Sequence, residues 1–158
     1  MKRLLEENPD FKNMAEAFAR LDPDVIRLVA LHKDTKYIVN GFSTNITVTA
    51  VEDKLMSAMP LDFVTGAVEE SLKQNGATLI SNQELASNNV NGVEIGTLEF
   101  QQAAPTVTGA SVQAHSKILI FQTGGKFILI QLAILKQFAQ ELLPTLDQIA
   151  DTVKRIEE

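Results

Sequence analysis

The sequence predicts an α+β fold in which an antiparallel β-sheet is flanked by helices on both faces. Two observations lead to this prediction. Strand-like segments follow one another from residue 77 to residue 135 without a helical pattern between them, and strands joined without a crossover pair antiparallel. The last of these segments, Phe127–Leu135, is apolar in both alternation phases, which is typical of a strand that is covered on its two faces.

Length and composition place the chain among ordinary globular proteins. It has 158 residues, of which 45% are hydrophobic and 22% charged, and this is enough for a packed core. No internal repeat, low-complexity run or long linker divides the sequence. We therefore expect one domain that spans residues 1–158.

The chain opens with a predicted helix and a strand. Asn8 and Pro9 form a helix start, because an asparagine side chain caps a helix and proline is tolerated at its first position. Pro23 ends this helix, since the residue before a proline avoids the α region, and a strand from Val25 to His32 follows. The apolar stripe of the helix consists of Phe11, Met14, Ala15, Phe18 and Leu21.

The next part of the chain predicts a strand and a second helix. After a turn at Asn40–Gly41, the segment Phe42–Ala50 alternates apolar and polar residues, which predicts a strand with one solvated face. Apolar residues at helical spacing then predict a helix over Pro60–Gln74. Asn75–Gly76 supplies the left-handed residue at which such a helix ends.

The second half predicts consecutive strands and a closing helix. Four strand-like segments cover residues 77–85, 92–101, 110–123 and 126–135, and a tight turn at Gly124–Gly125 joins the last two. The closing helix carries an apolar stripe from Leu142 to Ile156. We expect Pro144 in the first turn of that helix, since a proline further inside removes a backbone hydrogen bond.

Charge and cysteine content exclude several classes of function. The chain carries 20 acidic and 14 basic residues, so it repels a phosphate backbone and an anionic membrane, and nucleic acid is not an expected partner. The absence of cysteine excludes disulfides, thiolate metal sites and a cysteine nucleophile. No apolar run is long enough for a transmembrane segment, and Glu6 and Glu7 interrupt the start of a signal peptide.

The two histidines predict no metal site. Neither His32 nor His115 has a partner at metal-ligand spacing. His115 shares its alternation phase with polar residues of its strand, so we expect it on a solvated rim. No metal ligand and no cofactor is predicted.

Catalytic patterns are also weak. Ser43, His32 and Asp34 combine into a triad only on paper, because no strained serine turn accompanies them. Gly124–Lys126 lacks the remainder of a phosphate-binding loop and is explained as a hairpin turn. We predict no catalytic residue, and the binding residues stay unknown. Two pairs of carboxylates, Glu69 with Glu70 and Asp22 with Asp24, are candidates for acid–base chemistry, but we expect them on solvated helix faces or at a helix start. Asn45 and Thr47 fit the glycosylation pattern, but we expect both on a strand.

The predicted elements run in the order helix, two strands, helix, several antiparallel strands and terminal helix, and they include the segments Asn8–Phe11, Leu28–Leu31, Gly41–Val48 and Leu146–Val153. In this order and in these segments the chain resembles the PsbP-like superfamily. This superfamily includes photosystem II extrinsic subunits, a Ran-binding nuclear transport factor and bacterial envelope lipoproteins. The resemblance implies a three-layer αβα sandwich whose members mostly bind other proteins without performing chemistry. It carries over no site residue.

The resemblance also implies a location and a missing segment. In that superfamily a strand or hairpin usually precedes the first helix, whereas this sequence opens almost at its helix and contains no tryptophan. We therefore expect that residues 1–158 lack an amino-terminal strand or an export signal of a longer protein. The resemblance by itself favours an extracytoplasmic, envelope-anchored location.

Three functions are consistent with the sequence. The first is a non-enzymatic binding or interaction domain of a bacterial cell-envelope protein, with a protein or small ligand as its partner on a sheet face or helix edge. The second is an enzyme whose site is assembled from distant strands, with His115 and a carboxylate as its best candidate. The third is a structural protein that self-associates through an open sheet edge. Oligomeric state and compartment stay undetermined at this stage.

Overall fold

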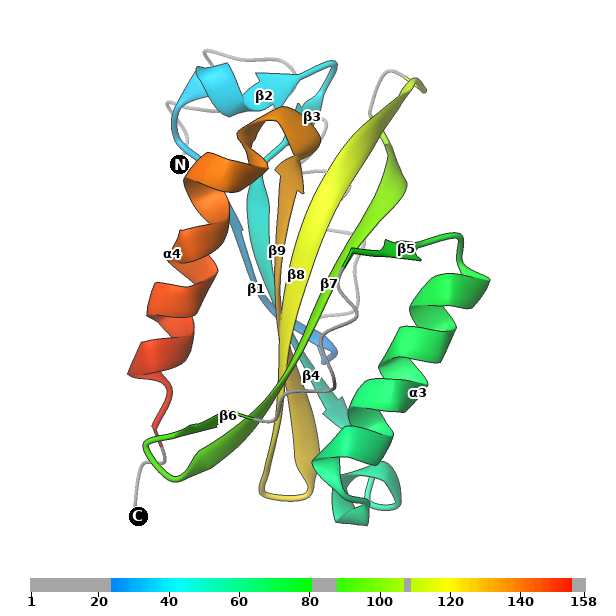
Figure 1. Ribbon diagram of the computed structural model, residues 1–158, viewed down its shortest axis with the longest axis vertical. Helices are drawn as coiled ribbons and strands as arrows, with labels where there is room; N and C mark the ends of the chain where they lie inside the picture. Colours follow the sequence, from blue (N-terminus) through cyan, green and yellow to red (C-terminus); the bar gives the residue numbers. More distant parts are fainter. Residues whose placement is uncertain (1–23, 81–87, 107–108, 155–158) are drawn as a thin grey trace.

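The computed structural model of the chain describes residues 24–80, 88–106 and 109–154. Within these residues a seven-stranded sheet has the order β1-β4-β9-β8-β7-β5, and β6 pairs with the beginning of β7 (Figure 1). Each pairing in the sheet is antiparallel. The strands are β1 Ile26–Leu31, β4 Asn45–Glu52, β5 Thr78–Leu79, β6 Asn88–Val90, β7 Val93–Pro105, β8 Ser111–Thr123 and β9 Lys126–Leu135.

Two α-helices of the described residues lie on opposite faces of this sheet, α3 (Leu61–Gln74) on one and α4 (Ala139–Thr152) on the other (Figure 1). A small hairpin of β2 (Ile38–Val39) and β3 (Phe42–Ser43) lies beyond the end of β9. The predicted α+β class, an antiparallel sheet with helices on both faces, is confirmed. Three 3-10 turns complete the elements: η1 Thr35–Tyr37, η2 Met56–Ala58 and η3 Lys136–Phe138.

Burial on both faces of the central strands places the helices. Side chains alternate along β8, so Ile118 and Ile120 pack toward α3, whereas Leu119 packs toward α4. Val64 of α3 and Leu146 of α4 are both fully buried against these side chains. Each such burial stabilises the fold by about 1.5–3 kcal/mol. The side chains of β9 also pack on both faces, as the sequence predicts: Leu129 packs on the α3 side and Leu132 on the α4 side.

One glycine allows α3 to approach the sheet closely. A Cβ atom on Gly96 of β7 would lie 2.3 Å from Oγ1 of Thr65. Thr65 cannot easily move away, because it is 1% exposed and its hydroxyl donates to the carbonyl of Leu61 at 2.8 Å. The absence of a side chain at residue 96 is therefore a condition of this helix–sheet contact.

The strand predicted over Phe42–Ala50 differs from the observed one. The turn before it is confirmed, with φ of 52° at Asn40 and 76° at Gly41. The strand is interrupted at Thr44, however, and its polar phase is not the solvated one, since Ser43 is 2% exposed and Asn45–Thr49 are all half-buried. The reason is that β4 lies between β1 and β9, so side chains of both neighbouring strands flank its own and leave them half-buried.

Most other element predictions are confirmed. Strands β1, β8 and β9 and helix α3 match their predicted ranges, and φ is positive at Gly76, Gly124 and Gly125 as expected. Only Thr78–Leu79 of the segment 77–85 forms a strand among the described residues. Strand β6 is not predicted by the sequence; it joins β7 through a turn with positive φ at Asn91 and Gly92. The helix predicted from Asn8 lies outside the described residues.

The prediction for Pro144 is wrong. Helix α4 begins at Ala139, directly after η3, so Pro144 lies beyond its first turn. The missing N–H of Pro144 removes the helical hydrogen bond to the carbonyl of Gln140. Gln140 is exposed near the start of the helix, where water can hydrate that carbonyl.

A pair of glycine substitutions tests the contact between α3 and β7. Gly96→Ala is expected to lower the free energy of unfolding by about 1–3 kcal/mol, because its Cβ would overlap Thr65. Gly66→Ala is the matched control: it lies within α3 with no atom within 4 Å of the new Cβ, and it should raise stability by about 0.5–1 kcal/mol. Urea denaturation of both variants measures the difference. A Gly96→Ala protein as stable as the wild type would contradict this packing.

Candidate binding cleft

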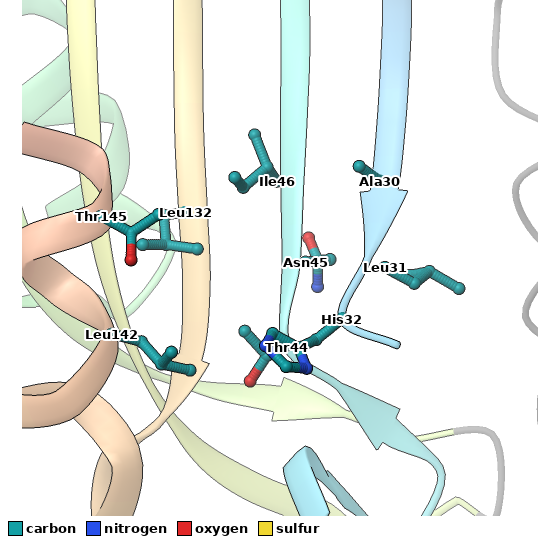
Figure 2. Close-up of a pocket in the computed structure, with 9 residues that line it drawn as sticks. All are labelled: Ala30, Leu31, His32, Thr44, Asn45, Ile46, Leu132, Leu142 and Thr145. Carbon is teal, nitrogen blue, oxygen red and sulfur yellow. The ribbon is translucent and has the colours of Figure 1, made fainter. Parts of the chain in front are cut away.

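A cleft of about 180 Å³ lies between helix α4 and the strands β1, β4 and β9 (Figure 2). Its floor follows from strand register: Ala30 pairs with Ile46, and Ile46 pairs with Leu132, so the three side chains project side by side toward α4. Leu142 and Thr145 of α4 form the facing wall. Most of the lining is therefore apolar.

His32 and Thr44 form the polar end of the cleft (Figure 2). The backbone N–H of His32 donates to the carbonyl of Thr44 at 2.9 Å, which holds the two residues next to each other. Nδ1 of His32 accepts a hydrogen bond from the backbone N–H of Asp34 at 3.1 Å. In the neutral imidazole the proton is therefore on Nε2, which is left as a donor.

The hydroxyl of Thr44 is buried without a hydrogen-bond partner in the part of the chain that the structure describes. The residue is 3% exposed. A buried hydroxyl without a partner costs about 1–3 kcal/mol. Burial of that kind is uncommon, so a polar group is expected to meet this hydroxyl when the cleft is filled.

A polar link between the loop after β1 and α4 holds the helix over the cleft. The Tyr37 hydroxyl donates to Oε1 of Glu141 at 2.5 Å, and Lys36 Nζ donates to the same oxygen at 3.1 Å. Both contacts lower the pKa of Glu141, the hydroxyl of Tyr37 contributing most. The ring of Tyr37 lies edge-on to that of His32, with centroids 4.1 Å apart, so the same link orients the polar end of the cleft.

The opposite end of α4 is also tied to the sheet. The side-chain amide of Asn91, in the turn between β6 and β7, donates to the carbonyls of Asp151 and Val153 at 3.2 and 3.0 Å. Lys117 of β8 forms an ion pair with Asp147 in the second half of the helix. These contacts hold α4 above β8 and β9 and leave the floor near β1 uncovered.

His115 does not lie on a solvated rim, which corrects the prediction. It is 8% exposed, and its Nε2 lies 2.7 Å from Oε1 of Glu99 on the neighbouring strand β7. β8 lies between β7 and β9, so side chains of both neighbouring strands lie beside the imidazole. The structure thus joins His115 to a carboxylate, but neither residue of the pair lines the cleft between α4 and β1. The adjacent Ser116 has a separate partner, since its hydroxyl accepts a hydrogen bond from Nε2 of Gln131 at 3.4 Å.

The other predicted candidates have ordinary structural partners. The Ser43 hydroxyl donates to the carbonyl of Thr44 at 3.3 Å, so Ser43, His32 and Asp34 do not form a triad. Glu69 pairs with Lys73, Glu70 accepts from Gln74, and the side chain of Asn45 donates to the carbonyl of Ser43. Asp22 lies outside the described residues. Gly124–Gly125 forms the hairpin turn between β8 and β9, as predicted.

Two features are absent from the described residues. In residues 24–80, 88–106 and 109–154, no group of three or more histidine, aspartate and glutamate side chains is arranged to hold a metal ion. No helix within those ranges has the length and apolar character needed to cross a membrane.

Comparison with known proteins gives a fold likeness. No family model matches the sequence, and no curated protein matches it. The crystal structure of PA94, a protein of unknown function from Pseudomonas aeruginosa, superposes with a TM-score of 0.66 at 9% identity over 88% of each chain. The solution structure of cyanobacterial PsbP from Synechocystis sp. PCC 6803 gives a TM-score of 0.49 at 15% identity, over 84% of this chain and 94% of that one. The likeness to PA94 shows that the two chains share a fold.

The polar link to Glu141 predicts a pH dependence of stability. The pKa of this carboxyl is lowered in the folded protein, so its contribution is fully present above the unfolded value near 4.5 and is lost as pH falls through the folded value. Glu141→Gln should lower the melting temperature by a few degrees at most at pH 7, since the ion pair is exposed. The difference from wild type should shrink in thermal melts as the pH falls below 4.5.

Glu94→Gln is the control for this experiment. Glu94 is an exposed strand carboxylate with no hydrogen bond to any described side chain or backbone group, and its substitution should change the melting temperature little at any pH. An equal effect of Glu141→Gln at pH 7 and pH 3 would show that the carboxylate charge plays no part in holding α4.

Proposed function

We propose that this chain is a non-enzymatic binding domain whose ligand lies in the cleft between α4 and β1. The observation that carries the proposal is a cleft with an apolar floor and with His32 and Thr44 together at one end; Asn45 and Thr145 are its other polar lining residues. A concave apolar site with a few convergent polar groups is the usual form of a ligand pocket. The alternation of β1, β4 and β9 builds its floor, so the site belongs to the sheet itself.

The chemistry of the cleft favours binding over catalysis. A general base needs a free acceptor, but Nδ1 of His32 already accepts the Asp34 N–H. A nucleophile needs a neighbouring base, but the hydroxyl of Ser43 donates to a backbone carbonyl. The His115–Glu99 pair is the one observation that favours the enzyme alternative, and its separation from the cleft lining counts against it.

Exposed apolar surface continues from the cleft along β1. Leu28 is 52% exposed and projects to the same face as Ala30, two residues further along the strand. Its partner across the β1–β4 pairing is the half-buried Val48. Apolar side chains left open beside a cleft support a partner that is itself apolar over part of its surface.

The resemblance to the PsbP-like superfamily supports the setting of this proposal. Because that superfamily includes bacterial envelope lipoproteins, we place the binding domain, residues 1–158, in a cell-envelope protein. Fractionation of the source cells that recovers the protein only from the cytoplasm would contradict this location.

Blocking the cleft tests the proposed function. Toluene is a suitable apolar probe, and its binding is measured by NMR titration of the methyl groups of Ile46, Leu132 and Leu142. Ala30→Phe places a ring over the cleft floor from an exposed strand position, so it should weaken toluene binding at least about tenfold.

Ala103→Phe and His115→Gln are the controls. Ala103 is also an exposed strand alanine, but it lies on β7 outside the cleft, and His115 belongs to the part-buried pair with Glu99. Both variants should bind toluene as the wild type does. If toluene shifts no cleft methyl group, or if Ala30→Phe and Ala103→Phe act alike, the cleft is not the binding site.

A further inference from the structure

The unpartnered hydroxyl of Thr44 distinguishes this cleft from a purely apolar hollow. Oγ1 exposes less than 1 Å² and has no hydrogen-bond partner among the described residues. The side chain points into the polar end of the cleft, on the side of Leu142 (Figure 2). A rotation of about 120° about the Cα–Cβ bond moves Oγ1 to the position that the methyl group holds now and moves the methyl group to that of the hydrogen, which changes the direction in which the hydroxyl points.

His32 supplies a second, oriented donor at the same end. Its Nε2 makes no hydrogen bond to the described residues, while Nδ1 is held by the Asp34 N–H at 3.1 Å. The ring packs edge-on against Tyr37, which is 3% exposed and is itself held by Glu141. The direction of this donor is therefore set before a ligand arrives, which reduces the entropy lost on binding.

The charge of the cleft restricts the ligand to a neutral head group. No lysine, arginine, aspartate or glutamate lines it. The nearby charges of Lys36 and Glu141 are already paired at 3.1 Å. A carboxylate or an ammonium group would lose its hydration in the cleft without gaining an ion partner, whereas a hydroxyl or carbonyl oxygen needs only hydrogen bonds.

The volume of the cleft restricts the ligand's apolar part. Its 180 Å³ is close to the volume of about 150 Å³ at which an apolar cavity holds one benzene molecule. One ring or a short branched hydrocarbon fills it, and a long acyl chain does not fit within it.

From these four observations we infer that the cleft selects a small neutral molecule with an apolar body and one hydroxyl or carbonyl oxygen, which Thr44 and His32 hydrogen-bond. This inference rests on the proposed binding function and adds the chemical class of the ligand. Thr44 and His32 are then specificity-determining residues: Ile46, Leu132 and Leu142 bind the apolar body, and the polar end selects the oxygen.

Three probes with the same ring and different head groups test this class. Toluene has no polar group, benzyl alcohol has a hydroxyl, and benzoate has a charge at pH 7. Dissociation constants are measured on the full chain by the methyl titration described above. For each protein we take the ratio of the dissociation constant of toluene to that of benzyl alcohol, and we compare this ratio between wild type and variant. The two free probes are hydrated differently, but this difference is the same for both proteins and cancels in the comparison.

Thr44→Val removes the hydroxyl and keeps the shape of the side chain. It should shift the ratio about 3- to 10-fold against benzyl alcohol, the value of one net hydrogen bond. Thr44→Ser retains the hydroxyl and should keep the wild-type preference. Thr49→Val is the matched control, since Thr49 lies on the opposite face of β4 and does not line the cleft; it should leave the ratio unchanged. Benzoate should bind more weakly than benzyl alcohol.

The outcomes separate this inference from the proposed function. An unchanged ratio in Thr44→Val, or tighter binding of benzoate than of benzyl alcohol, would overturn the ligand class, while toluene binding that Ala30→Phe blocks would still support a binding cleft. Failure of all three probes to shift the cleft methyl groups would remove both proposals.

Discussion

The whole arrangement depends on the burial of the central strands on both faces. Strands β8 and β9 carry apolar side chains in both alternation phases, and water must be excluded from each face. A single helix covers only one face, so α3 and α4 must lie on opposite sides of the sheet. Gly96 lets α3 approach β7 closely, whereas polar contacts at both ends hold α4.

The cleft is a consequence of where α4 is held. The helix packs over β8 and β9 through Leu146, and its two polar ties keep it there. Strand β1, further along the sheet, is left partly uncovered on that side, with Leu28 and Ala30 exposed. Side chains of a strand point alternately to the two faces of the sheet, whether or not a helix covers them. The apolar side chains on the uncovered part of the α4-facing side therefore form a floor beside the helix. The proposed binding site is thus the uncovered margin of the α4-facing core.

Much of the fold was predictable from local patterns, but the cleft was not. Alternation, helical spacing and glycine turns predicted β1, α3, β8 and β9 with correct type and nearly correct ranges. His115 was misplaced because its contact with Glu99 depends on the pairing of two strands, which no local pattern contains. Thr44 carried a usable signal: it is the polar member of the apolar phase Phe42, Thr44, Ile46 and Val48, and a polar residue in a core-facing phase has a reason to be there.

The sequence by itself determined the class of the fold and the positions of β1, α3, β8 and β9, because spacings of two and of three or four residues are local properties of the chain. It also excluded thiol chemistry, since the chain contains no cysteine. Only the tertiary structure decided that His32 and Thr44 meet at one end of an apolar cleft and that the Thr44 hydroxyl is buried without a partner. Those facts depend on strand register and on the position of α4 against the sheet. Both bring together residues of β1, β4, β9 and α4 that are far apart in the chain.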